Sequence, residues 1–159
     1  MKIALRRVAE GDRDFLLALY ASTREAELAL LPWTEAQKQS FVEMQFAAQM
    51  RSYAATHPAA HHDIICVEEQ PVGRLYLDRG AELLHILDIS IAPQHRNAGI
   101  GSEVLQALLE EADRDGKRIT IYVEDFNPSR SLFDRLGFRP ASVNGFLILL
   151  ARPAAASAR

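Results

Sequence analysis

The sequence is poor in the features on which disulfide-bonded, membrane-spanning and nucleic-acid-binding proteins depend. Its one cysteine, Cys66, has no partner for an internal disulfide, and the apolar run IICV around it is typical of a small buried core residue. No apolar stretch approaches the ~18 residues of a transmembrane helix. The net charge of -3 lacks the excess of Lys and Arg that phosphate neutralisation requires, so we expect neither a membrane nor a nucleic acid as partner.

An apolar signal-peptide core is also missing from the first residues. MKIALRRVAEGD alternates like a strand, and we therefore expect a cytoplasmic protein. With 159 residues, 48% hydrophobic and 25% charged, the chain has the size and composition of one globular domain. We assign residues 1–152 to this domain and expect the tail PAAASAR, residues 153–159, to be loose because it has nothing to pack.

Hydrophobic periodicity predicts the secondary structure, and single residues mark two helix ends. Thr34 with Gln37 three positions later forms a capping-box pattern, and Gly116 follows the last periodic residue of a later helix. The first helix loosens around residues 22–23 and resumes until Pro32. The expected order, typical of one α/β domain, is strand 2–8, helix from 12, helix 34–57, two strands within 61–78, strand 83–91, helix 100–114, strand 118–124, helix 129–136 and strand 146–151.

The stretch QHRNAGIGS, residues 94–102, places Gly99 and Gly101 where a predicted strand ends and a helix begins. A helix N-terminus offers free N–H groups and the positive end of the helix dipole, and glycines without Cβ atoms would let a phosphate approach them. Arg96 adds a fixed positive charge beside them. The pattern is neither a P-loop nor a dinucleotide-binding fingerprint, and on its own a turn eased by glycine also explains it.

Two blocks of sequence together resemble the GNAT superfamily of acetyl-CoA-dependent N-acetyltransferases. In ISIAPQHRNAGIGSEVLQALLEEA, Arg96, Gly99 and Gly101 fill the family's loop, in which Arg or Gln is followed after two residues by Gly-x-Gly or Gly-x-Ala. In IYVEDFNPSRSLFDRLGF, the second family block is matched by Asn127, Leu132, Leu136, Gly137 and Phe138. The resemblance implies an α/β (α+β) single domain with a mixed, mostly antiparallel sheet of about six to seven strands and about four helices.

The resemblance also implies how acetyl-CoA would bind as co-substrate. The pantetheine arm would add to the edge of the strand before the loop, pairing with the backbone of Ile89 and Ile91. Asn127 would contact the cofactor arm, although a cap for the following helix is an alternative role. The pyrophosphate would lie over the loop residues Arg96, Asn97, Ala98, Gly99, Ile100, Gly101 and Ser102.

One position departs from the family pattern. Where the family commonly has a tyrosine that protonates the leaving thiolate and contacts the cofactor, this sequence has Phe133, which has no proton to give. Another donor could serve, or the thiolate could leave unassisted, since a thiol pKa near ~8.5 makes thiolate a tolerable leaving group. The third alternative is a protein that no longer catalyses.

The general base would be a carboxylate or a histidine on the strands that flank the loop. Asp88, His85 and Glu124 are the candidates, and Asp88 has an organising role in the fold as its alternative. His85 and Asp88 have opposite parity, so at most one faces the site unless a bulge intervenes. His57, His61 and His62 resemble a metal cluster only superficially, and we expect no metal.

The family's first two helices usually wall the acceptor pocket. Here they contain Tyr20, Arg24 and Trp33, although a solvated helix face and a core plug are alternative roles for the last two. We expect transfer of acetyl to a primary amine of a small molecule or peptide by direct attack. A non-catalytic acyl-CoA-binding module is the alternative that Phe133 raises. A homodimer formed through free sheet edges is a further expectation.

Overall fold

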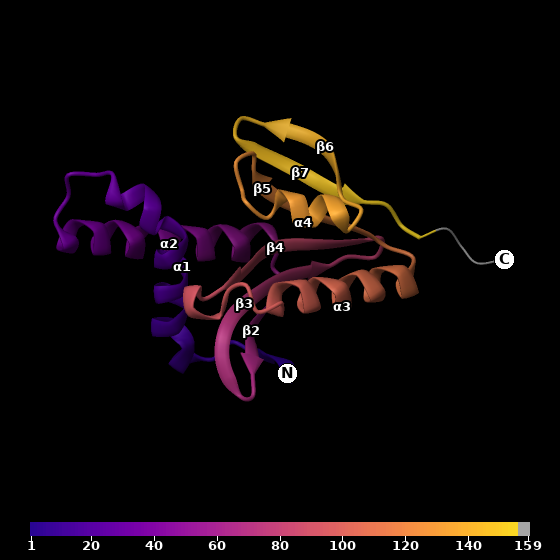
Figure 1. The fold of residues 1–159 in the computed structure, drawn as a ribbon, viewed down its shortest axis with the longest axis horizontal. Helices are drawn as coiled ribbons and strands as arrows, with labels where there is room; N and C mark the ends of the chain where they lie inside the picture. Colours follow the sequence, from indigo (N-terminus) through magenta and orange to yellow (C-terminus); the bar gives the residue numbers. More distant parts are fainter. Residues whose placement is uncertain (156–159) are drawn as a thin grey trace.

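A mixed seven-stranded sheet forms the centre of the computed structural model, which describes residues 1–155 (Figure 1). The strands lie in the order β1-β2-β3-β4-β5-β7-β6. β4 and β5 run parallel, and the other neighbours are antiparallel. This confirms the expected mixed, mostly antiparallel sheet. The strands are β1 Ile3–Arg7, β2 His61–Val67, β3 Gln70–Arg79, β4 Leu83–Ile91, β5 Arg118–Glu124, β6 Arg139–Asn144 and β7 Leu147–Arg152.

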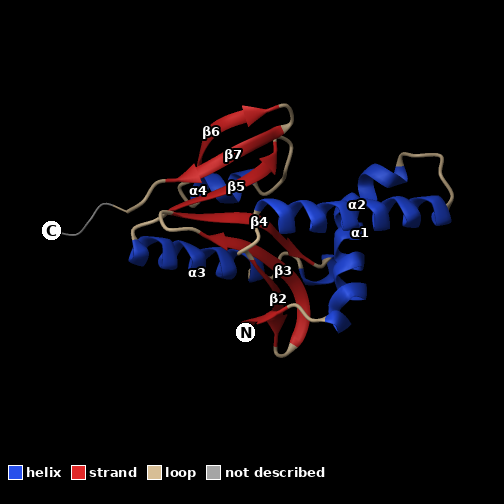
Figure 2. Ribbon diagram, turned by 180° about the vertical axis from the view of Figure 1, so that it is seen from behind, coloured by secondary structure: helices blue, strands red, loops and turns tan. Residues whose placement is uncertain are grey.

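Helices cover both faces of the sheet (Figure 2). The α-helices are α1 Arg13–Ala29, α2 Glu35–Thr56, α3 Ile100–Asp115 and α4 Arg130–Arg135, with short 3-10 turns η1 Glu10–Asp12 and η2 Pro93–His95. α1 and α2 pack on one face, where Ile64 and Cys66 of β2 point into their core. α3 and α4 pack on the other, where Ile65 contributes to a larger core. Cys66 is therefore the buried core residue that its apolar run predicts. None of the described helices is long and apolar enough to cross a membrane.

The predicted helix caps are confirmed. Thr34 Oγ1 accepts a hydrogen bond from the Gln37 N–H at 3.1 Å, and Gln37 Oε1 accepts one from the Thr34 N–H at 2.9 Å, so α2 begins with a capping box. α3 ends at Gly116, whose φ of 65° lies in the left-handed region that favours glycine. α1 is continuous through Ser22 and Thr23, whose hydroxyls donate to backbone carbonyls one turn earlier in the helix.

Strand β6 is the element that the hydrophobic pattern misses. All six of its residues are exposed, it contains Pro140, and it pairs with β7 alone, so it is an outer edge of the sheet. An edge strand without a buried face carries no alternation for a sequence pattern to detect. The homodimer remains a prediction, since β1 and β6 are the edges through which strands of two copies would pair. Residues 153–155 have no regular structure, and the rest of the expected tail, 156–159, lies outside the described residues.

His62 of β2 is partly buried, and its ring nitrogen Nε2 is fully enclosed. Its ring stacks on Tyr76 at 4.4 Å between centroids, and Nε2 has no hydrogen bond within the described part of the chain. Burial, assisted by the positive charge of Arg74, lowers the pKa of His62 to about 4 from its usual 6.5. Between these two pH values the unfolded chain binds a proton that the folded chain does not. The free energy of unfolding should therefore fall as the pH drops through this window.

We predict that His62→Gln makes the protein less sensitive to acid. Between about pH 7 and about pH 4.5 the variant should lose on the order of 2 kcal/mol less unfolding free energy than the unchanged protein. Urea unfolding at the two pH values measures this difference. His95→Gln, in the exposed turn η2, is the matched control and should retain the original pH dependence. An equal acid-induced loss in His62→Gln and the unchanged protein would contradict the prediction.

Candidate active site

The sheet opens between the parallel strands β4 and β5. Their backbones pair from Leu83 with Arg118 as far as Ile86 with Ile121, and beyond that rung both strands continue without pairing to each other. Figure 1 shows β5, β7 and β6 tilted away from β4. The far part of β4 therefore pairs with β3 on one side, and its other edge has no strand partner among the described residues.

A β-bulge in β4 lies next to the last paired rung. Tyr76 of β3 pairs with Asp88 and Leu77 pairs with Ile86, so Leu87 is an extra residue without a partner in β3. The bulge brings Asp88 and His85 to the same face of the sheet, which their spacing in a regular strand would not allow. Both side chains accordingly lie on the side of the sheet covered by α2. His85 stacks on His57 at the end of that helix. Asp88 accepts a hydrogen bond from Arg74, which in turn donates to Gln49 of α2.

The glycine loop connects β4, through η2, to α3. Gly99 is the N-cap of α3 with a φ of 82°, and Asn97 also has a left-handed φ of 62°. Glu103 is the first residue of the helix whose N–H finds a backbone acceptor, the Gly99 carbonyl at 3.0 Å. The N–H groups of residues 100–102 thus have no hydrogen-bond acceptor within residues 1–155, and they lie at the positive end of a 16-residue helix.

The two glycines are required for different reasons. Gly99 needs its left-handed φ, which an L side chain adopts only with strain. Gly101 has no such conformation, and a Cβ added there would meet only Ile91 Cγ1 at an ordinary 3.8 Å. Packing within the described residues therefore gives no reason for glycine at 101. An external group that approaches the backbone there supplies one.

Arg96 ties this loop to the rest of the molecule. Its Nε donates to the Ile91 carbonyl at 3.0 Å, and Nη2 lies 3.5 Å from Ser22 Oγ of α1. The side chain is exposed, so its remaining donors are accessible beside the free N–H groups. The pantetheine arm was expected to pair with the backbone of Ile89 and Ile91, and the carbonyl of Ile91 already accepts this hydrogen bond from Arg96.

Asn127 and Phe133 occupy the second block that resembles the family. Asn127 Oδ1 accepts the Ser129 N–H at 2.8 Å, which closes a turn just before α4, whose N-cap is Ser129 itself. Phe133 is 3% exposed and packs edge-on against Phe138 at 5.4 Å between centroids. Its ring lies in the core on the α3 and α4 face of the sheet.

The three candidate bases have different surroundings. Asp88 Oδ2 accepts hydrogen bonds from Arg74 Nε and Ser90 Oγ, both at 2.7 Å, which leaves Oδ1 free of partners within the described residues. His85 Nδ1 lies 2.7 Å from the Thr120 hydroxyl across the β4–β5 pairing, and burial lowers the pKa of His85. The Glu124 side chain, 37% exposed, stands at the end of β5.

The expected acceptor residues lie in two places. Arg24 Nε donates to Tyr20 Oη at 3.3 Å, and Arg24 Nη1 is 3.8 Å from Glu124 Oε1, so α1 reaches the end of β5 beside the opening. Trp33 instead packs edge-on against Phe41 at 5.3 Å, in the connection between α1 and α2. The structure thus brings Tyr20 and Arg24 to the opening and leaves Trp33 outside this group.

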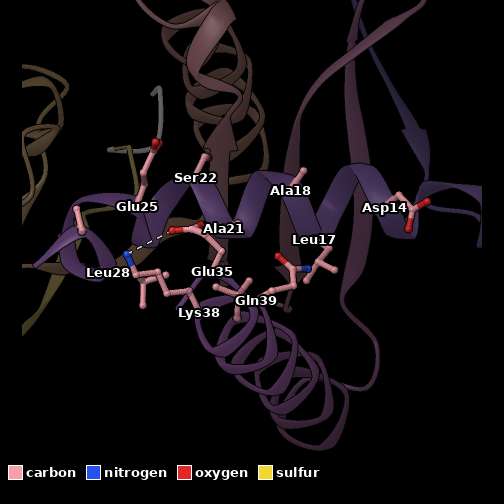
Figure 3. Close-up of a pocket in the computed structure, with 12 residues that line it drawn as sticks. Asp14, Leu17, Ala18, Ala21, Ser22, Glu25, Leu28, Glu35, Lys38 and Gln39 are labelled. Atoms are coloured by element: carbon pink, nitrogen blue, oxygen red, sulfur yellow. Dashed lines mark ion pairs between the residues drawn. The ribbon is translucent and has the colours of Figure 1, made fainter. Parts of the chain in front are cut away.

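A groove of about 720 Å³ lies between α1 and the first half of α2 (Figure 3). Lys38 and Glu35, on its α2 side, form an ion pair with a separation of 3.7 Å. Figure 3 shows Ser22 and Glu25 projecting from the side of α1 that faces away from α2. Ser22 is the residue that Arg96 contacts, so this side of α1 borders the glycine loop.

The three histidines near the end of α2 have separate partners. His57 Nδ1 is 2.6 Å from Asp78 Oδ2, His61 Nδ1 is 3.3 Å from Arg79 Nη1, and His62 stacks on a tyrosine. Among residues 1–155, no three His, Cys, Asp or Glu side chains are grouped closely enough to hold a metal ion. The His57–Asp78 pair was not predicted as part of a site, because no local pattern marks a contact across 21 residues.

Comparison with known proteins places these features in a family. A sequence model of the Acetyltransferase (GNAT) family matches residues 23–138. The PaiA N-acetyltransferase from Thermoplasma acidophilum, solved in complex with coenzyme A, superimposes with a TM-score of 0.71 at 15% identity, over 96% of this chain and 99% of that one.

Two further structures are similar in fold to this chain. The ribosomal-protein-S18-alanine N-acetyltransferase from Escherichia coli gives a TM-score of 0.63 at 15% identity, over 99% of this chain and 97% of that one. Naa50 from Arabidopsis thaliana, in complex with the bisubstrate analogue CoA-Ac-MVNAL, gives 0.62 at 14% identity, over 96% and 99%. At these identities the likeness shows a common fold.

We predict that Phe133→Tyr destabilises the protein. The added hydroxyl would be buried in the core against Phe138, and leaving it without a partner should cost about 1–3 kcal/mol of unfolding free energy. Phe126→Tyr, at a side chain that is 68% exposed, is the matched control and should change stability by less than about 0.5 kcal/mol. Urea unfolding of the three proteins measures both effects, and an unchanged stability of Phe133→Tyr would refute the buried placement.

Proposed function

Because the chain belongs to the acetyltransferase (GNAT) family, we propose that it transfers the acetyl group of acetyl-CoA directly to a primary amine of a small molecule or peptide. Membership of the family makes it an acyl-CoA-dependent N-acetyltransferase in general terms. The proposal adds the direct attack, the residues that hold the cofactor and the class of acceptor. One observation supports it most: the edge of β4 that does not pair with β5 leads into the glycine loop, and the helix α3 that follows has N–H groups without acceptors within the described residues.

Acetyl-CoA is the co-substrate, and the opening between β4 and β5 is where we propose that it binds. The pyrophosphate would accept hydrogen bonds from the loop N–H groups up to Ser102, with Arg96 beside it. The pantetheine arm would add to the free edge of β4 at Ile89 and Ile91. The coenzyme A bound to the PaiA enzyme supports the choice of ligand.

Attack on a thioester requires a neutral amine, so a base must remove its proton. Asp88, His85 and Glu124 are proposed as candidates, since each lies on a strand that borders the opening. Phe133 lies in the core and has no proton to give. We therefore propose that the coenzyme A thiolate leaves without a proton from position 133, as its modest basicity allows.

A peptide or small-molecule amine is the proposed acceptor class. One protein of similar fold is named a ribosomal-protein-S18-alanine N-acetyltransferase, and another is in complex with the bisubstrate analogue CoA-Ac-MVNAL. Both names support a peptide amine. In this chain the acceptor would approach beside Tyr20 and Arg24, where α1 meets Glu124. The paired charges there would orient a polar acceptor.

A non-catalytic acyl-CoA-binding module is the second candidate, favoured only by the missing tyrosine at Phe133. Release of the coenzyme A thiol over a panel of amines and N-terminal peptides separates the two functions. We expect turnover with at least one acceptor, and any turnover excludes the second candidate. Calorimetric binding of acetyl-CoA without thiol release across the whole panel would contradict the proposed transfer.

We predict that Gly101→Val weakens coenzyme A binding at least about tenfold, because the side chain would occupy the space of the pyrophosphate. Stability should change little, since the added Cβ meets only one protein atom within 4 Å, at 3.8 Å. Gly11→Ala, where an added Cβ meets nothing within 4 Å, is the control and should bind normally. Calorimetry on the folded proteins measures the affinities. Unchanged affinity in Gly101→Val would remove the loop from the binding site.

A further inference from the structure

The last turn of α2 lies over β4 at the start of the opening. The Tyr53 hydroxyl donates to the carbonyl of Leu87, the bulged residue, at 3.1 Å. One turn later His57 caps the helix, with its N–H bonded to the Tyr53 carbonyl at 2.8 Å. The His57 ring stacks on His85, with centroids 5.5 Å apart and planes inclined by 25°. This end of α2 therefore holds an imidazole on the acceptor side of the sheet, next to the last β4–β5 rungs.

A carboxylate fixes the protonation of this imidazole. Asp78 of β3 pairs with His85 in the sheet register, and its Oδ2 lies 2.6 Å from His57 Nδ1. Because an ionised carboxylate only accepts hydrogen bonds, Nδ1 must carry the hydrogen. In the neutral ring Nε2 then carries a lone pair. Both side chains are 28% exposed, and Nε2 has no partner within the described residues, so a substrate or a water molecule can reach it.

The groups around the His57–Asp78 pair disfavour a second positive charge, on His85. The titratable residues around His57 are Asp78 from β3, His85 from β4, and Tyr122 from β5, which meets His85 edge-on at 5.7 Å. Tyr53, on α2, precedes His57 by one helical turn. Burial lowers the pKa of His85, positive charge on His57 lowers it further, and the Asp78 carboxylate opposes these two effects. The net direction favours the neutral form of His85. Asp78 balances the imidazolium that forms.

We propose that His57, oriented by Asp78, is the group that takes the proton from the acceptor amine, an inference that rests on the acetyl transfer proposed above. The amine nitrogen forms a bond to the thioester carbon, and its proton passes to His57 Nε2 directly or through one water. The carbon–sulfur bond breaks with its electron pair on sulfur. The imidazolium then returns the proton to the thiolate, which restores neutral His57 and supplies the proton that Phe133 lacks.

The pair meets the requirements of a base more fully than the strand candidates do. One oxygen of Asp88 is held by Ser90 and by the guanidinium of Arg74, whose side chain is only 3% exposed. Glu124 Oε1 lies 3.8 Å from Arg24 Nη1, so this carboxylate is already engaged in an ion pair. His57 alone combines a free ring nitrogen with a carboxylate that fixes the other one. Asp78 acts through His57 and is a positioning residue.

The first test compares His57→Gln with His61→Gln. Glutamine keeps the backbone cap of α2 but provides no base, so kcat/KM should fall at least about 100-fold while the affinity for acetyl-CoA stays within about twofold. His61→Gln changes a histidine that contacts Arg79 on the neighbouring strand, and it should keep its activity. A folded His57→Gln variant with kcat/KM within about threefold of the unchanged protein overturns the inference.

The second test separates positioning from mere structural support. Asp78→Asn still accepts the Nδ1 hydrogen, but it no longer stabilises the imidazolium. We expect kcat to fall at least about tenfold and the acid limb of the pH–rate profile to move to lower pH. An acid limb that stays in place in Asp78→Asn contradicts the assignment.

Imidazole ¹⁵N chemical shifts provide a measurement that needs no acceptor. The shifts should show His57 protonated at Nδ1 and unprotonated at Nε2 near neutral pH, and the opposite tautomer overturns the proposal. If the unchanged protein binds acetyl-CoA and turns over no amine, the proposed transfer fails together with this inference. If the unchanged protein and His57→Gln turn over equally, this inference alone fails.

Discussion

The extra residue in β4, Leu87, determines how the sheet presents its opening. The bulge follows the last rung that joins β4 to β5, and beyond it the two strands separate. It also turns His85 and Asp88 to the same face, and the Leu87 carbonyl accepts the Tyr53 hydroxyl that holds the end of α2 in place. Burial raises the pKa of Tyr53 to about 12, so this hydroxyl remains a donor. The bulge at Leu87 thus accounts for three features of the opening: the separation of β4 from β5, the shared face of His85 and Asp88, and the position of the end of α2.

Two kinds of backbone feature meet at this opening. The free edge of β4 offers donors and acceptors to an extended ligand, and the N-terminus of α3 offers N–H groups to an anion. Arg96, in the loop between them, contacts the last residue of β4 and Ser22 of α1. The proton transfer that we propose lies on the face covered by α2. In this proposal the cofactor is held largely by the main chain, whereas acceptor recognition and proton transfer depend on side chains.

Patterns within a few residues of one another predicted much of the fold. Features that depend on contacts between distant segments could not be predicted from the sequence. The Thr34 capping box and the Gly116 helix end were predictable because each depends on residues within one turn. Strand β6 was missed because it has no buried face. The glycine loop was predictable as a pattern, but the bulge, the burial of Phe133 and the His57–Asp78 contact arise only when distant strands and helices pack.

The most direct test of the central claim is a crystal structure of the protein with bound coenzyme A. Pantetheine is expected in extended conformation along the free edge of β4, with pyrophosphate oxygens within hydrogen-bond distance of the N–H groups of Ile100, Gly101 and Ser102. The thiol should point toward the last β4–β5 rung, on the side covered by α2. Coenzyme A bound instead in the groove between α1 and α2, with the β4 edge unoccupied, would contradict the account.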